Sequence, residues 1–125
     1  MFNAPLKNAR GLGSAKDGTH HWIVQRLTAV ALIPLVIWFA YSVATQIGSD
    51  YTGVVQWIAL PWNTVLLVSF LAAGFWHSAL GVQVVIEDYV AGEFAKFTLL
   101  IASKLAHALL GLAAIISVLK ISFGA

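Results

Sequence analysis

The sequence predicts an all-α membrane protein with three transmembrane helices. Of its 125 residues, 60% are hydrophobic and only 10% are charged, and the mean hydropathy is +0.87. Soluble domains carry about a quarter charged residues, and disordered chains are poor in apolar residues. Both classes are therefore excluded. Two charge-free stretches of about 23 and 24 residues are each long enough to cross roughly 30 Å of hydrocarbon as a helix.

Residues 1–21 form a polar segment before the first span. The segment lacks the short apolar core and the small-residue cleavage site of a secretory signal peptide. Asp17 and the scarcity of arginine argue against a transit peptide. We therefore expect a cytoplasmic N-terminal tail over residues 1–21 and a three-helix transmembrane anchor domain over residues 22–125.

The anchor domain is expected to cross the membrane at about residues 22–47, 63–87 and 95–120. Pro34 lies inside the first span and is predicted to bend it, which neighbouring helices tolerate in a membrane. Gly48–Gly53 is typical of a turn. Trp57 and Trp62 mark a membrane interface, because indole rings favour the headgroup level. Val54–Leu60 is therefore expected to lie along that surface.

The basic residues indicate the orientation of the chain. Those that flank the first span and the loop at Glu87–Glu93 are Lys7, Arg10, Lys16, Arg26, Lys96 and Lys104. Only Lys120 falls on the other side. The positive-inside rule therefore predicts a cytoplasmic N-terminus and a C-terminus on the opposite side. We expect a multi-pass protein of a bacterial inner membrane rather than of a mitochondrial one.

Several kinds of site are excluded by composition and by missing motifs. The chain has no cysteine, which excludes disulfides, thiolate metal sites and iron–sulfur ligation. It has no glycine-rich phosphate loop and no His-Glu-x-x-His motif. The net charge of +2 comes from scattered residues, so nucleic-acid binding is not expected.

His77 is the first candidate functional residue, because an ionisable side chain inside a membrane span is costly. It lies about ten residues inside the second span, with Gly74 and Gly81 on the same helix face. The imidazole is either hydrogen-bonded to a neighbouring helix or an axial ligand of haem iron. The two glycines permit the close approach of another helix or of a flat macrocycle. On the third span, His107 is a lesser rival ligand and Lys104 is expected to snorkel.

Asp88 and Tyr89 follow at the end of the second span. The eleven residues from His77 to Asp88 make three helical turns plus about 20°, so both lie on one stripe, roughly 16 Å apart along the axis. The stripe joins a mid-membrane imidazole to a carboxylate near the cytoplasmic boundary. By itself, an acidic residue beside a tyrosine is also ordinary at a helix end that meets headgroups.

Arg26, His20 and His21 form a third group, at the start of the first span. Arg26 there is either a charge that sets topology or part of a clamp for an anionic group, such as a carboxylate, a propionate or a lipid phosphate.

Two segments of the sequence together resemble a known family. They are THHWIVQRLTA at residues 19–29 and HSALGVQVVIEDYV at residues 77–90. A histidine at the end of the tail, an arginine six positions later, His-x-x-x-Gly and Asp-Tyr resemble the small hydrophobic membrane anchor of succinate dehydrogenase (complex II), a cytochrome b anchor of the D type. The Ser-Pro-His and His-x-x-Asn-Gly-x-Arg-His segments of the sister anchor, the C type, do not occur in the sequence.

The resemblance implies a role for each matching residue. His77 would be one axial ligand of haem b, with the second histidine on a partner anchor. Tyr89 would hydrogen-bond a ubiquinone carbonyl oxygen, and Asp88 would orient that site or deliver protons. Arg26 and His20 would contact haem propionates or line the quinone pocket.

The resemblance also implies partners, which are a second anchor of the C type, an iron–sulfur subunit and a flavoprotein subunit. The chain would dock the latter two to the bilayer within a succinate:ubiquinone oxidoreductase, with no catalysis expected from the chain alone. Two alternatives stay open, a haem-free structural anchor and a small transporter subunit that relays protons through His77 and Asp88.

Overall fold

The structure, a computed structural model, describes residues 15–124 and is helical throughout that range apart from short connections. The helices are α2 (Ala15–Thr45), α3 (Tyr51–Ala59), α4 (Pro61–Tyr89) and α5 (Glu93–Gly124). The described residues contain no strand, so the predicted all-α class is confirmed. Most of the predicted tail, residues 1–14, lies outside the described residues.

Three of these helices confirm the predicted spans. The segments long and apolar enough to cross a membrane are Gly18–Thr45, Pro61–Tyr89 and Glu93–Gly124. The helices extend past the expected spans, and α2 begins at Ala15 rather than near residue 22. A helix satisfies its own backbone hydrogen bonds, so it can continue beyond the hydrocarbon where no residue breaks it.

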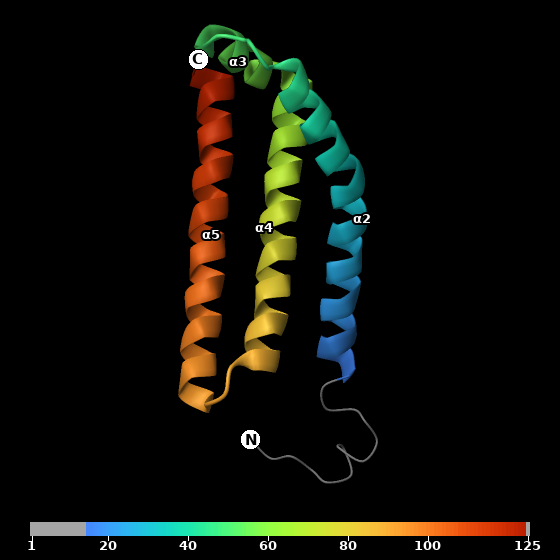
Figure 1. The fold of residues 1–125 in the computed structure, drawn as a ribbon, viewed down its shortest axis with the longest axis vertical. Helices are drawn as coiled ribbons and strands as arrows, with labels where there is room; N and C mark the ends of the chain where they lie inside the picture. Colours follow the sequence, from blue (N-terminus) through green and yellow to red (C-terminus); the bar gives the residue numbers. More distant parts are fainter. Residues whose placement is uncertain (1–14, 125) are drawn as a thin grey trace.

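Helix α2 carries Pro34 in its interior, and its C-terminal half curves toward α4 (Figure 1). Proline lacks the backbone N–H that would bond to the preceding turn, which is a common cause of bending. The curve agrees with the bend predicted for this span.

A corner helix, α3, joins α2 to α4. Gly48, at a φ of 89°, lies in the turn after α2. The Asp50 carboxylate then accepts a hydrogen bond of 2.8 Å from the backbone N–H of Gly53 and caps α3. The predicted turn over Gly48–Gly53 is therefore too long, because an aspartate at the N-cap allows the helix to begin at Tyr51.

Helix α4 lies between α2 and α5 and packs against both, while α3 packs across the ends of α4 and α5 (Figure 1). The α4–α5 approach is close at Gly111, where a Cβ atom would lie 3.3 Å from Cγ of Phe75. Only Leu67 and Ile86 among the described hydrophobic residues are buried, at 7% and 8% exposed. Most apolar side chains therefore face outward, as expected for a surface that meets lipid or partner subunits.

The first residues of α2 and the α4–α5 connection lie at one end of the bundle, and α5 finishes at the other (Figure 1). We name the first of these the Asp88 end, after the carboxylate near the terminus of α4. The two ends of the described chain are thus on opposite sides, as three spans require.

Candidate functional site

Polar side chains inside apolar helices fall into two groups. In one group every polar atom has a hydrogen-bond partner within the chain, and in the other at least one polar atom has none. A polar atom without a partner is costly in lipid. An atom left over therefore indicates where a cofactor, a substrate or a partner subunit would bind.

At the end opposite Asp88, the side chains of Thr64 and Asn63 bond to other residues of the chain. The Thr64 hydroxyl contacts the Ile58 carbonyl oxygen at 2.7 Å and the Ser122 hydroxyl at 2.8 Å. The Asn63 side-chain amide donates to the Trp57 carbonyl oxygen at 2.9 Å. These contacts tie α3, α4 and α5 together, which is a structural role.

His107 uses both of its ring nitrogens within the chain. Its Nδ1 lies 2.8 Å from the carbonyl oxygen of Ser103, which can only accept, so the proton is on Nδ1. Its Nε2 is then the acceptor for the Ser78 hydroxyl at 3.0 Å. No ring nitrogen is left to bind a metal, and His107 instead links α5 to α4.

His77 is bonded at one nitrogen only. Its Nδ1 lies 3.0 Å from the Thr28 hydroxyl oxygen on α2, and its Nε2 has no hydrogen-bond partner within residues 18–124. The side chain is half-buried in the α2–α4 contact. The hydrogen bond to a neighbouring helix is therefore present at Nδ1, while ligation of haem iron stays a prediction for Nε2.

The two glycines beside His77 face different surroundings. A Cβ atom at Gly74 would lie 4.0 Å from the Leu32 side chain of α2. A Cβ atom at Gly81 would meet nothing within 4 Å in the described part of the chain. Gly74 therefore serves helix packing, and open space adjoins Gly81. An imidazole with an unbonded nitrogen beside open space fits the axial side of a haem.

Two further unpartnered atoms lie on α2, between His77 and the Asp88 end. They are Nε2 of His21 and Oε1 of Gln25, both shielded from solvent and without a hydrogen-bond partner in the described residues. With Thr28 these residues occupy positions i, i+4 and i+7, which form one helix face. Thr28 and Gln25 are not among the residues predicted from the sequence, although a threonine and a glutamine inside an apolar span, on the helix face of His21, could have indicated them.

Asp88 and Tyr89 are both exposed at the end of α4, and Tyr89 has 83% of its surface accessible. Helix α4 is continuous from His77 to Tyr89, so the stripe predicted for His77 and Asp88 is retained. The carboxylate of neighbouring Glu87 accepts a hydrogen bond of 2.9 Å from the Gln83 amide. Asp88 is exposed and is adjacent in sequence to Tyr89.

Arg26 and His20 are exposed on α2, near the same end. The Arg26 guanidinium carbon lies 5.4 Å from the ring centroid of Trp22, a cation–π contact on its own helix. The structure thus gathers His77, Asp88, Tyr89, Arg26 and His20 at or toward the Asp88 end. Among the described residues, His77 is the one member of this group with a side-chain hydrogen bond to another helix, to Thr28.

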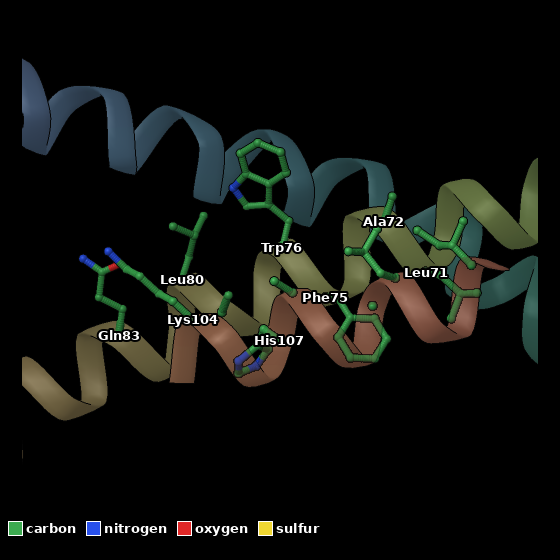
Figure 2. A pocket seen from close by; sticks show the side chains of 13 residues that line it. Leu71, Ala72, Phe75, Trp76, Leu80, Gln83, Lys104 and His107 are labelled. Atoms are coloured by element: carbon green, nitrogen blue, oxygen red, sulfur yellow. The ribbon is translucent and has the colours of Figure 1, made fainter. Parts of the chain in front are cut away.

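A groove of about 490 Å³ runs between α4 and α5 on another face of α4. Its lining is mostly apolar, and its polar side chains are His107, Gln83 and Lys104. Gln83 and Lys104 extend in the same direction, away from Leu71 and Phe75 (Figure 2). That direction leads toward the Asp88 end, which agrees with the expectation that Lys104 snorkels.

The chain is similar to known proteins over nearly all of its length. Residues 2–119 match the model of a family described as succinate dehydrogenase/fumarate reductase transmembrane subunit. A succinate dehydrogenase hydrophobic membrane anchor subunit of Rickettsia bellii is 37% identical over 94% of this chain and 94% of its own length. A protein of the same name from Paracoccus denitrificans is 31% identical over 99% of this chain and 95% of its own length. No solved structure matches the chain.

Proposed function

This chain belongs to the family of succinate dehydrogenase/fumarate reductase transmembrane subunits, and from that premise we propose a role for each residue of the candidate site. The chain is a multi-pass membrane anchor subunit of a succinate dehydrogenase. Within that complex, His77 would supply one axial ligand of haem b. Tyr89 and Asp88 would form part of the site where ubiquinone is reduced.

The observation that carries the haem assignment is the difference between the two intramembrane histidines. His107 has both ring nitrogens engaged, whereas Nε2 of His77 has no partner in the described chain. A haem bound there would exchange single electrons with the other redox groups of the complex. The second axial histidine would come from a partner anchor of the C type.

The quinone assignment rests on the chemistry of two adjacent side chains. Reduction of a quinone takes up two electrons and two protons, and negative charge develops on the carbonyl oxygens. The Tyr89 hydroxyl would donate a hydrogen bond to one of these oxygens, which stabilises that charge best in a site without water. The Asp88 carboxylate, at the end of α4, would pass protons from water to the same site.

Arg26 and His20 would contact a haem propionate or line the quinone pocket. A guanidinium offers several donors in a fixed plane and suits a haem propionate or a polar quinone pocket. The cation–π contact with Trp22 would hold the Arg26 guanidinium close to α2 when no propionate or quinone is bound.

The remaining partners would be an iron–sulfur subunit and a flavoprotein subunit, because this chain has no cysteine with which to ligate a cluster. They would dock at the Asp88 end, which the distribution of basic residues assigns to the cytoplasm. The bacterial relatives support a location in a bacterial inner membrane. The largely exposed apolar faces of the bundle are available to lipid and to the second anchor.

Haem ligation is tested by purifying the complex through this chain with either His77→Ala or His107→Ala. We expect His77→Ala to remove the haem b band from the reduced-minus-oxidised spectrum, and His107→Ala to leave that band in place. An unchanged band in the His77 variant would refute the ligand assignment. If the unsubstituted complex has a normal subunit composition but contains no haem, the haem-free anchor is favoured instead.

The quinone site is tested by Tyr89→Phe, with Tyr51→Phe as the matched control. Tyr51 is as exposed as Tyr89 (84% against 83%) but lies on α3, at the other end of the bundle. We expect a severe loss of quinone reduction for Tyr89→Phe only, while succinate oxidation by an artificial acceptor persists in both. Equal loss of the two activities would indicate a folding role.

A further inference from the structure

The hydroxyl of Thr28 makes three short contacts that together determine where its proton lies. Its Oγ1 is 2.9 Å from the carbonyl oxygen of Val24, 3.1 Å from that of Gln25 and 3.0 Å from Nδ1 of His77. Carbonyl oxygens only accept hydrogen bonds. An oxygen–oxygen separation of 2.9 Å therefore places the hydroxyl hydrogen toward the backbone of α2, as is common for threonine inside helices.

The proton in the contact with the imidazole must then come from the ring. Because the Thr28 hydroxyl already donates to the backbone, its lone pair accepts, and Nδ1 of His77 is the donor. A neutral imidazole with its proton on Nδ1 has a lone pair on Nε2. Nε2 is the nitrogen without a partner in the described residues.

We propose that Thr28 is a positioning residue, which holds His77 in the Nδ1–H tautomer and fixes its ring so that Nε2 is presented to the haem iron. The proposal rests on the proposed function, because it assumes that His77 is the ligand. It goes beyond that function by assigning a role to a residue on another helix, since the orientation of the His77 ring on α4 then depends on Thr28 of α2.

The local construction suits this role. The side chain of a threonine in a helix is restricted at χ1, and here the backbone bond to Val24 restricts it further. A hydroxyl that donates to a carbonyl becomes a better acceptor, because successive hydrogen bonds polarise one another. The contact of Leu32 with Gly74 keeps α2 close to α4 one turn away. The acceptor for Nδ1 is therefore fixed in distance and in direction.

An acceptor at the outer nitrogen of a ligating histidine orients the ring and raises its basicity, and its loss typically lowers metal affinity about 10- to 100-fold. In Thr28→Val, a methyl group of similar size replaces the hydroxyl, and Nδ1–H loses its acceptor. The ring can then rotate or place its proton on Nε2, and either change weakens the bond to iron. A less basic ligand also favours the ferrous haem, so the midpoint potential should rise.

The test compares three variants of the purified complex, with haem measured per flavin. Thr28→Val removes the acceptor, and Thr28→Ser keeps it. Ser78→Ala is the matched control, because it removes a hydroxyl that is bonded to the other intramembrane histidine, His107, at the same 3.0 Å. The readouts are haem content, the electron paramagnetic resonance spectrum of the ferric haem and its midpoint potential.

We expect Thr28→Val to lose haem on the order of tenfold, or to show a shifted ferric spectrum and a raised midpoint potential in the haem that remains. Thr28→Ser and Ser78→Ala should match the unsubstituted complex. An unchanged spectrum and potential in Thr28→Val, or an equal shift in Ser78→Ala, would overturn the proposal.

Two further outcomes separate this proposal from the proposed function. If His77→Ala removes haem while Thr28→Val does not alter it, only the role of Thr28 fails. If His77→Ala keeps its haem, the ligand assignment itself fails. Should Thr28→Val not assemble, Thr28→Ala is measured in its place. If neither hydroxyl-free variant assembles while Thr28→Ser does, the hydroxyl serves folding and the proposal is overturned.

Discussion

Replacing Thr64 with valine should destabilise the helix bundle without altering haem. Thr64 is 6% exposed, and its hydroxyl joins the start of α4 to α3 and to α5. It donates to the Ile58 carbonyl oxygen at 2.7 Å and is placed to accept from the Ser122 hydroxyl at 2.8 Å. Valine has nearly the same shape, so the substitution removes the hydrogen bonds and little packing.

The expected magnitude follows from these two bonds. A typical hydrogen bond contributes about 0.5–1.5 kcal/mol to stability, and side-chain bonds between membrane helices average about 0.6 kcal/mol. Loss of both bonds should therefore lower the free energy of unfolding by about 1–2 kcal/mol. Ser122→Ala removes only one of the two and should cost about 0.6 kcal/mol. In the double variant the shared bond is lost once, so the combined effect should be smaller than the sum of the two single effects.

The assay is unfolding in mixed micelles, with helix content followed by circular dichroism as the mole fraction of dodecyl sulfate rises. Ser117→Ala is the control, because that exposed hydroxyl on α5 bonds only the Ala113 carbonyl oxygen, within the same helix. A Thr64→Val chain as stable as Ser117→Ala would refute the reasoning. So would loss of haem from the purified complex at unchanged stability, because it would assign this end of the bundle to the cofactor.

Three other predictions concern the packing and the Asp88 end. Gly111→Val should reduce the yield of assembled complex several-fold, because even a Cβ atom there would lie 3.3 Å from Phe75. Gly124→Val should assemble normally, because a Cβ atom there would meet nothing within 4 Å in the described residues. Arg26→Gln should lower the haem midpoint potential in a redox titration, since it removes a positive charge that favours the reduced haem, and Arg26→Lys should preserve it. Asp88→Asn should slow quinone reduction about 100-fold or more with an unchanged haem spectrum; a normal rate would exclude a proton-transfer role.

The sequence predicted the three spanning helices because their signal is contained within each segment. A run of about 20 apolar residues crosses hydrocarbon whatever its neighbours are. The common stripe of His77 and Asp88 was predictable for the same reason, since it depends only on the pitch of one continuous helix. The start of α3 was misjudged locally, because Asp50 can be read as a turn residue or as an N-cap.

The contact between Thr28 and His77 could not be predicted, because it depends on how far α2 is displaced along α4. Apolar helices with few buried residues show no periodic face from which that displacement could be predicted. Leu67 and Ile86 are the only buried hydrophobic residues in the described chain. The hydrogen bond between His107 and Ser78 could not be predicted either, because it depends on the displacement of α5 along α4. Sequence alone therefore left His77 and His107 as candidate ligands, and the pairing of helices leaves a ring nitrogen without a partner in the described residues on His77 but not on His107.

That distinction follows from a general property of membrane interiors. Lipid offers no hydrogen bonds, so every polar atom of a spanning helix must find its partner in protein, in a cofactor or in trapped water. At the α3 end, the hydroxyls of Thr64 and Ser122 hydrogen-bond to each other. Midway along α5, both ring nitrogens of His107 are hydrogen-bonded, to Ser78 and Ser103. The atoms without partners among residues 18–124 include Nε2 of His77 and, shielded from solvent, Nε2 of His21 and Oε1 of Gln25.

These three atoms belong to α2 and α4, the helices that also carry Arg26, Asp88 and Tyr89. A structural anchor that held no cofactor would gain nothing from a histidine satisfied at one nitrogen, since leucine would pack there without a polar atom to satisfy. The partnerless Nε2 of His77 therefore supports the proposed ligand role, which the His77→Ala variant tests. Gln25→Leu offers an independent check, because it removes an unpartnered atom. It should stabilise the isolated bundle in the dodecyl sulfate assay but impair the assembled complex if Gln25 Oε1 has a partner there.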